Sequence, residues 1–137
     1  MAFTIIDKPG RSLIFSGSSF EAAYSYSRAV VVGAQIMLSG TTGYDYATET
    51  LAEGAAEQTR QLFRNAEKAF AEAGATLADV VRVRIYIARA EDYEPVMAAF
   101  AEAFRGVNPA CTTVQAGLFD PDIRVEMDMD AVLDVPA

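Results

Sequence analysis

The stretches VVRVRIYI, residues 80–87, and IRVEMDMDA, residues 123–131, both alternate between apolar and mostly charged side chains. Successive side chains of a β-strand point to opposite faces of the sheet, so this period of two predicts two strands, each with one apolar and one polar face. The apolar faces are expected to hold Val81, Val83, Ile85 and Ile87, and Ile123, Val125, Met127, Met129 and Ala131. The polar faces would hold Val80, Arg82, Arg84 and Tyr86, and Arg124, Glu126, Asp128 and Asp130.

Two segments with helical periodicity are available to cover the apolar faces. Apolar residues recur three and four positions apart over residues 55–73, after a capping-box signal formed by Thr50 and Glu53. A second apolar stripe covers residues 93–104, with Asp92 as its expected N-cap. A glycine follows each stripe, which is typical of a helix end. Because each stripe must be buried, both helices are expected on one face of the sheet.

The rest of the chain supplies the other strands. We expect an opening hairpin of residues 3–6 and 12–15, a β-rich segment at 24–32, and strands at 35–39 and 112–117. Residues 16–20 and 39–50 read as loops. The pattern predicts an α/β (α+β) fold for residues 1–137 as a single domain, with a mixed six-stranded sheet and two helices packed on one face.

The composition limits the chemistry. The chain has 137 residues, no histidine, one cysteine and a formal net charge of −8. Ser-His-Asp triads, Cys-His pairs and histidine-based zinc sites are therefore excluded. The acidic excess opposes binding to nucleic acid, which depends on Lys and Arg at phosphates. Since the chain has neither a leader-like start nor an apolar run of about 18 residues, we expect a soluble cytoplasmic protein without a membrane partner.

The polar sheet face allows two interpretations. In CTTVQAG, residues 111–117, the apolar Val114 and Ala116 would place Cys111, Thr113 and Gln115 on that polar face. The face can be a solvated surface on which arginines of residues 80–87 pair with carboxylates of residues 123–131. It can instead pack against other subunits, with its charged side chains lining a cleft for a small anion.

Three stretches, in this order, resemble the Rid (reactive intermediate deaminase, YjgF-like) family, historically labelled L-PSP endoribonucleases. They are YSRAVVVGAQIMLSGTTG at 26–43, QTRQLFRNAEKAFAEAGATLADVVRVRIYIA at 58–88 and NPACTTVQAGLFDPDIRVEMDMDAV at 108–132. The resemblance implies a chorismate-mutase-like fold and a homotrimer with ligand clefts between subunits. It also implies hydrolysis of short enamine or imine acids to 2-keto acids and ammonia, with no metal or organic cofactor.

The resemblance also assigns site residues. Tyr26 corresponds to the family's cleft tyrosine, Gly40 to the glycine whose backbone approaches the ligand, and Glu126 to the glutamate proposed to hold the attacking water. Thr113 stands where many members have a cysteine. Deaminating members bind the substrate carboxylate through an arginine that is replaced here by Cys111, as in a branch of the family that lacks it. The family asparagine of the second helix is replaced by Met97.

Two hypotheses of function follow. In the first, the protein is an imine or enamine deaminase in which Glu126 is catalytic, and Arg84, or less favourably Arg82, supplies the missing cation beside Cys111. In the second, it is a non-catalytic trimer that binds a small metabolite, or it acts on an imine without a carboxylate. Ribonuclease activity is opposed by the charge and the absent histidine. Without a histidine to activate it, the Cys111 thiol is expected to fill space rather than act as a nucleophile.

Overall fold

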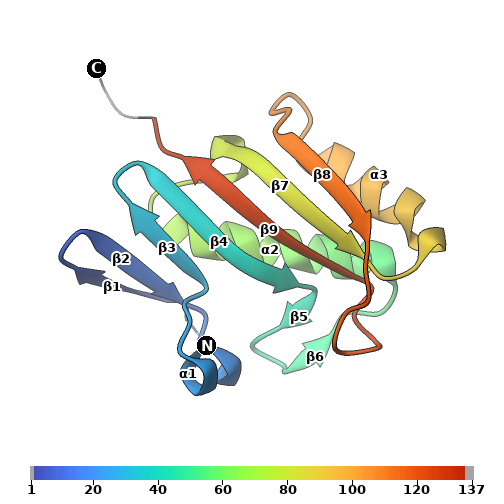
Figure 1. The fold of residues 1–137 in the computed structure, drawn as a ribbon, viewed down its shortest axis with the longest axis horizontal. Coiled ribbons are helices and arrows are strands. Elements are labelled where there is room, and N and C mark those ends of the chain that lie inside the picture. The colour runs from blue at the N-terminus through green and yellow to red at the C-terminus, as the bar shows by residue number, and fades with distance from the viewer. Residues whose placement is uncertain (1, 135–137) are drawn as a thin grey trace.

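The computed structural model describes residues 2–134, which form a mixed sheet covered on one face by two helices (Figure 1). The sheet has seven strands in the order β1-β2-β3-β4-β9-β7-β8. All neighbours are antiparallel except β7 and β8. The strands are β1 (Thr4–Lys8), β2 (Arg11–Phe15), β3 (Ala29–Val32), β4 (Gln35–Thr42), β7 (Val80–Ile87), β8 (Ala110–Gln115) and β9 (Val125–Val132). The predicted α+β class, with one mixed sheet and two helices on one face, is confirmed, and the sheet has seven strands where six were expected.

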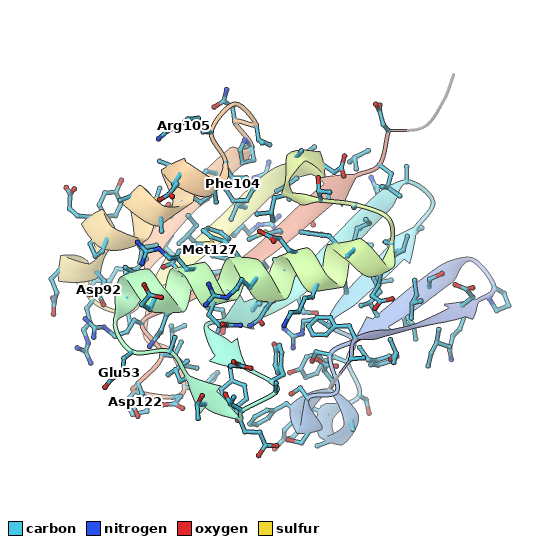
Figure 2. All side chains as sticks on the ribbon, turned by 180° about the vertical axis from the view of Figure 1, so that it is seen from behind. Glu53, Asp92, Phe104, Arg105, Asp122 and Met127 are labelled. Carbon is cyan, nitrogen blue, oxygen red and sulfur yellow. The ribbon has the colours of Figure 1, made fainter. Side chains whose placement is uncertain are left out.

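The long helices α2 (Ala55–Glu72) and α3 (Tyr93–Ala103) lie on the same face of the sheet, and Figure 2 shows them in front of it when the molecule is seen from behind. The stripe of α2 is buried, with Leu62, Ala66 and Phe70 fully enclosed. It packs against the apolar face of β4 and β9, where Met127 and Met129 are also fully enclosed. Burial of these apolar side chains is the main stabilising contribution to such a layered fold. The opposite face carries neither long helix and is called the open face below.

The capping box predicted for the start of α2 was wrong. The N-cap of α2 is Gly54, with φ +82° and no side-chain capping bond. Thr50 lies instead in β6 (Thr50–Leu51), which pairs with β5 (Tyr44–Asp45) in a separate small sheet. The structure has a capping box elsewhere, at Thr76 and Asp79, around the short 3₁₀ helix η1 (Leu77–Asp79). The long loop thus folds on itself, which takes Thr50 away from the helix end.

The segment between β2 and β3 also differs from the prediction. Residues 19–24 form the short helix α1 (Ser19–Tyr24), whose N-terminal amide of Phe20 donates to the Ser18 hydroxyl. The β-rich segment expected from residue 24 begins only at Ala29. The sequence gives no apolar stripe for α1, because the side chain that it buries is the charged Glu21.

Strand alternation holds where the ladder is regular. The apolar side chains of β9 from Val125 to Ala131 are buried, as predicted. In β7 the register shifts between Val80 and Arg82. Val80 is therefore 3% exposed and Val81 47% exposed, the reverse of the prediction. A bulge of this kind moves every side chain before it to the other face.

The predicted orientation of β8 was wrong. In the β7–β8 pairing Cys111 lies opposite Val83, and Thr113 lies opposite Ile85. Opposite residues share a face, so Cys111, Thr113 and Gln115 lie on the helix-covered side rather than the open face. The contact of the Thr113 hydroxyl with Met97 Sδ in α3, at 4.0 Å, agrees with this orientation. Strand β8 is the sheet edge and is largely exposed, so its sequence pattern carries little information about burial.

Among residues 2–134, no helix is both long enough and apolar enough to span a lipid bilayer.

Candidate functional site

Glu126 and Gly40 meet across the pairing of β9 with β4. Glu126 is half-buried, and a Cβ atom built on Gly40 would lie 2.6 Å from Glu126 Oε2. No real Cβ tolerates such a distance, so the carboxylate rests against bare backbone that only glycine offers. The pairing is irregular here: Leu38 faces Met129 and Thr41 faces Met127. Two residues of β4 therefore stand opposite one residue of β9, which is the arrangement of a β-bulge.

Burial raises the pKa of the Glu126 carboxyl group above its usual value. The positive charge of Arg28 opposes this increase, and the negative charge of Asp128 adds to it. A carboxylate with a raised pKa holds a proton more tightly and is a better base near neutral pH. Such shifts are frequent at functional sites, so Glu126 is the leading candidate for acid–base chemistry.

Arg28 is the residue of this site that sequence reasoning missed. Its Nη1 donates to the Gly40 carbonyl at 2.6 Å and to the Thr41 hydroxyl at 3.2 Å. Its Nε donates to Glu21 Oε2 at 3.0 Å. The side chains of Arg28 and Glu21 are only 4% and 2% exposed. The only signal in the sequence was an arginine directly before an apolar strand, and no periodicity pointed from it to Glu21.

Tyr26, which the family resemblance assigns to the ligand cleft, lies beside Arg28. The Arg28 guanidinium carbon lies 5.7 Å from the centre of the Tyr26 ring and 6.0 Å from that of Tyr46. An arginine at this distance from an aromatic face is attracted by the ring. Tyr26 is 39% exposed, whereas burial raises the pKa of Tyr46. Tyr26, Gly40 and Glu126 are thus linked through one buried guanidinium.

Arg84 lies on the open face, as predicted, but its charge is already paired. Its Nη1 donates to Asp128 Oδ1 at 2.8 Å and lies 3.8 Å from Asp130 Oδ2. The Tyr86 hydroxyl donates to the other oxygen of Asp128 at 2.9 Å. These contacts match the interpretation of this part of the face as cross-strand ion pairs. Within residues 2–134, no three Cys, Asp or Glu side chains come together as metal ligands do.

Cys111 and Thr113 form a second group with Met97, on the other side of the sheet. Cys111 Sγ lies 3.6 Å from the Thr113 hydroxyl. A pocket of about 380 Å³ adjoins this group and is lined by Ile87, Arg89, Ala90, Tyr93, Thr113, Val114 and Gln115. The expectation that Cys111 shares a face with Arg84 and Glu126 is therefore wrong. Within one chain, the expected site residues fall into two groups separated by the sheet.

Comparison with known proteins agrees with this fold and with the motifs. The family model described as Endoribonuclease L-PSP matches residues 16–133. An uncharacterized protein of Streptomyces coelicolor is 33% identical over 118 residues, which cover 85% of this chain and 87% of that protein. The 2-iminobutanoate/2-iminopropanoate deaminase of Dermatophagoides farinae is 31% identical over 110 residues, covering 80% and 86% of the two chains.

A solved structure is similar over nearly the same extent. The crystal structure of a member of the YjgF/YER057c/UK114 family from Mycobacterium tuberculosis is 40% identical, with a TM-score of 0.82. The match covers 90% of this chain and 99% of the other. The family model, the relatives and the shared fold agree, and the chain belongs to the Rid (YjgF-like, L-PSP endoribonuclease) family.

Proposed function

We propose that the protein is a homotrimer that acts in the cytoplasm on a small reactive imine or enamine, hydrolysing it with Glu126 as the group that positions and deprotonates water. The observation that carries the proposal is the half-buried Glu126 carboxylate, with its raised pKa, held against the bare backbone of Gly40. The deaminase name of the Dermatophagoides relative supports the same reaction class.

The reaction needs only water and proton transfer. An enamine first becomes an imine by gaining a proton on carbon and losing one from nitrogen. Glu126 takes a proton from a water molecule while the oxygen of that water attacks the C=N carbon. The electron pair of the C=N π bond moves to nitrogen, which is protonated. The resulting carbinolamine passes its hydroxyl proton through the Glu126 carboxylate to the nitrogen. The C–N bond then breaks, its electron pair leaves with nitrogen as ammonia, and the C=O bond forms. Imine and water thus give a carbonyl compound and ammonia. No oxidant, metal or organic cofactor enters this balance.

The separation of the two side-chain groups supports a cleft between subunits. Glu126 and Gly40 meet on the open face of the sheet. Cys111 and Thr113 lie on the helix-covered face, in the edge strand β8. One chain cannot bring both groups to the same small molecule through its own sheet. A second copy that places its β8 edge beside the first copy's Glu126 would join them. Light scattering at micromolar concentration tests the assembly, and the mass of one chain would contradict it.

The activity is tested with freshly generated 2-aminoacrylate, by measuring 2-keto acid release. We expect Glu126→Gln to lower the rate by about 10²–10⁴-fold, the usual contribution of a positioned acid or base. Asp130→Asn is the matched control, since it removes another carboxylate from the same face of β9, beyond Asp128. A wild-type rate equal to that of buffer would overturn deamination of this substrate class.

A second function remains a candidate because of Cys111 and Met97. A thiol cannot form the bidentate contact that an arginine makes with a carboxylate. The protein would then bind a small metabolite without catalysis, or act on an imine that has no carboxylate. Cys111→Arg separates these functions: gained activity on 2-aminoacrylate would indicate that only the anion contact was missing. Activity of the wild type on a neutral imine, with none on 2-aminoacrylate, would favour the non-carboxylate substrate.

A further inference from the structure

A buried ion pair between Glu21 and Arg28 contacts β4 at Gly40 and Thr41. Glu21, from the short helix α1, accepts hydrogen bonds from Arg28 Nε, from the Ser16 amide at 2.9 Å and from the Ser16 hydroxyl. Arg28 Nη1 donates hydrogen bonds to Gly40 and Thr41 of β4. A buried ion pair contributes little net stability compared with apolar residues of similar size, so its presence calls for another reason.

We propose that Arg28 is a positioning residue for Glu126: its hydrogen bonds to the Gly40 carbonyl and the Thr41 hydroxyl fix the β4 bulge that holds Gly40 against the Glu126 carboxylate, and Glu21 fixes Arg28. For its catalytic consequence the proposal rests on the proposed function. Its structural part does not, because it concerns where the carboxylate lies.

The bulge is the element that needs fixing. The extra residue in β4 breaks the regular ladder with β9 between Leu38 and Thr41, so the carbonyl of Gly40 needs a partner from elsewhere. Arg28 Nη1 supplies it at 2.6 Å. The neighbouring groups are held as well: the Ser39 amide donates to the Arg28 carbonyl at 2.9 Å, and the Thr41 hydroxyl donates to the Ser39 carbonyl at 2.8 Å. Backbone and side chain of one residue, Arg28, therefore both bind the bulge.

The contacts require a fork-shaped cation. Nε and Nη1 of one guanidinium donate in different directions, to Glu21 and to Gly40, at the same time. The ammonium of a lysine is a compact point charge and does not reproduce this geometry, although it keeps the charge. The same guanidinium lies against the rings of Tyr26 and Tyr46. Loss of the fork is therefore expected to release Gly40 and Tyr26 together.

The charge of Arg28 also reaches Glu126. The charged or titratable groups that act on Glu126 are Arg28 and Asp128, and Glu126 in turn acts on the Tyr86 hydroxyl. Arg28 is the group among these that stabilises the negative charge of Glu126, and its removal takes that stabilisation away. The pKa of Glu126 should then rise further, whereas removing the negative charge of Glu21 alone should not raise it.

The experiment compares Arg28→Lys, Glu21→Gln and the double variant Glu21→Gln/Arg28→Met by NMR. Arg60→Gln, from the exposed Arg60–Glu57 pair of α2, is the control. Glutamate labelled with ¹³C at its carboxyl carbon reports the pKa of Glu126, and ¹⁵N spectra report the amides of Gly40 and Thr41. The double variant, which leaves no buried carboxylate unpaired, should titrate Glu126 at higher pH. Arg28→Lys should shift the Gly40 and Thr41 amides while leaving the Glu126 titration closer to wild type.

Each result decides the proposal. Unchanged Gly40 and Thr41 amides in Arg28→Lys would overturn it, and so would an unchanged Glu126 titration in a folded double variant. If the double variant does not fold, the amides of Arg28→Lys decide alone. When deamination is measurable, Arg28→Lys should lower kcat about tenfold or more, because small misplacements of a reacting group are costly. If no deamination is measurable, the NMR results still stand, so the failure of the proposed function is distinguished from the failure of this inference.

Discussion

Gly40 and Glu126 approach so closely that a Cβ on Gly40 would lie 2.6 Å from Glu126 Oε2 and 3.1 Å from Glu126 Cδ. The two residues come from neighbouring strands, β4 and β9, and meet where β4 has a bulge. The contact joins the Glu126 carboxylate, whose pKa is raised by burial, to a stretch of backbone that Arg28 holds.

Gly40→Ala should leave the fold intact but displace the carboxylate. The atoms that the new methyl group meets belong to the flexible end of Glu126, which can move away at little cost. We expect a loss of stability below about 1 kcal/mol, at the low end of the effects of overpacking. The displacement should change the Glu126 carboxyl resonance and lower any deaminase rate. Urea unfolding and the ¹³C titration measure the two effects.

Gly43→Ala should behave in the opposite way. A Cβ on Gly43 would lie 2.5 Å from the Cα and carbonyl oxygen of Gln58, which are backbone atoms of α2. Backbone of a packed helix cannot move aside as a carboxylate does, so we expect a loss of stability of about 2 kcal/mol or more. Urea unfolding of both alanine variants gives the comparison. Equal losses in the two variants would contradict the assignment of the Gly40 contact to the Glu126 side chain.

Glu126→Gln should make the protein more stable at neutral pH. Because burial raises the pKa of Glu126 in the folded state, the folded state binds this proton more tightly than the unfolded state. Stability therefore falls as pH rises from the usual pKa of a glutamate through the raised value, and it is unaffected by this group below that window. The variant lacks this loss. Urea unfolding across a pH series measures the free energy of unfolding of both proteins. The prediction would be contradicted if the wild type became more stable relative to the variant as the pH rises.

The regular parts of the fold were predictable because burial gives them a period. Strand β9 is covered by α2 on one face and paired on both edges, so its buried side chains from Val125 to Ala131 alternate without exception. Strand β8 is the sheet edge, with most of its residues exposed, so Val114 did not mark the buried side. The bulge between Val80 and Arg82 could not be predicted from the alternation, since Val80 and Val81 are both valines and either could be the buried one.

The site was predictable only in part, for a related reason. The family motifs brought Tyr26, Gly40 and Glu126 together, and the structure places all three around Arg28. Arg28 itself is held by Glu21, seven residues earlier, in a segment with no apolar period. A buried ion pair depends on tertiary contacts that leave no repeating pattern in the sequence. The family motifs therefore pointed to Glu126, and neither the motifs nor the periodicity pointed to Arg28 and Glu21, which hold the backbone beside it.

Arg84→Gln should leave carboxylate binding unchanged. The guanidinium of Arg84 is exposed and already binds Asp128 and Asp130. Its cation is therefore not free for a ligand, and an exposed pair of this kind contributes little to stability. We expect an unfolding midpoint that cannot be separated from wild type, and an unchanged KM for 2-aminoacrylate where activity is present. A KM raised tenfold or more would restore Arg84 as the substitute for the missing family arginine.

Arg124→Met should destabilise the protein by about 2 kcal/mol or more, because it leaves the carboxylate of Asp92 buried without a partner. Arg124 Nε and Nη2 donate to the two oxygens of Asp92 at 2.6 Å each, and Figure 2 shows Asp92 near the start of α3. The pair joins the approach to β9 with the start of α3. The double variant Asp92→Asn/Arg124→Met should recover part of the loss in urea unfolding, and no recovery would contradict this account.

Cys111 should react with a thiol reagent at the rate of an ordinary free thiol. An activated thiolate needs a cation or a base beside it, and the sequence has no histidine to act as the base. Cys111 lies on the side of the sheet opposite Arg84, and its sulfur is 3.6 Å from the neutral hydroxyl of Thr113. We expect the pseudo-first-order rate with a disulfide reagent to lie within about threefold of that of glutathione at the same pH. Because Cys111 is the only cysteine, Cys111→Ser is a complete blank. A tenfold faster reaction would contradict the prediction and point to a cation contributed by a second copy of the chain.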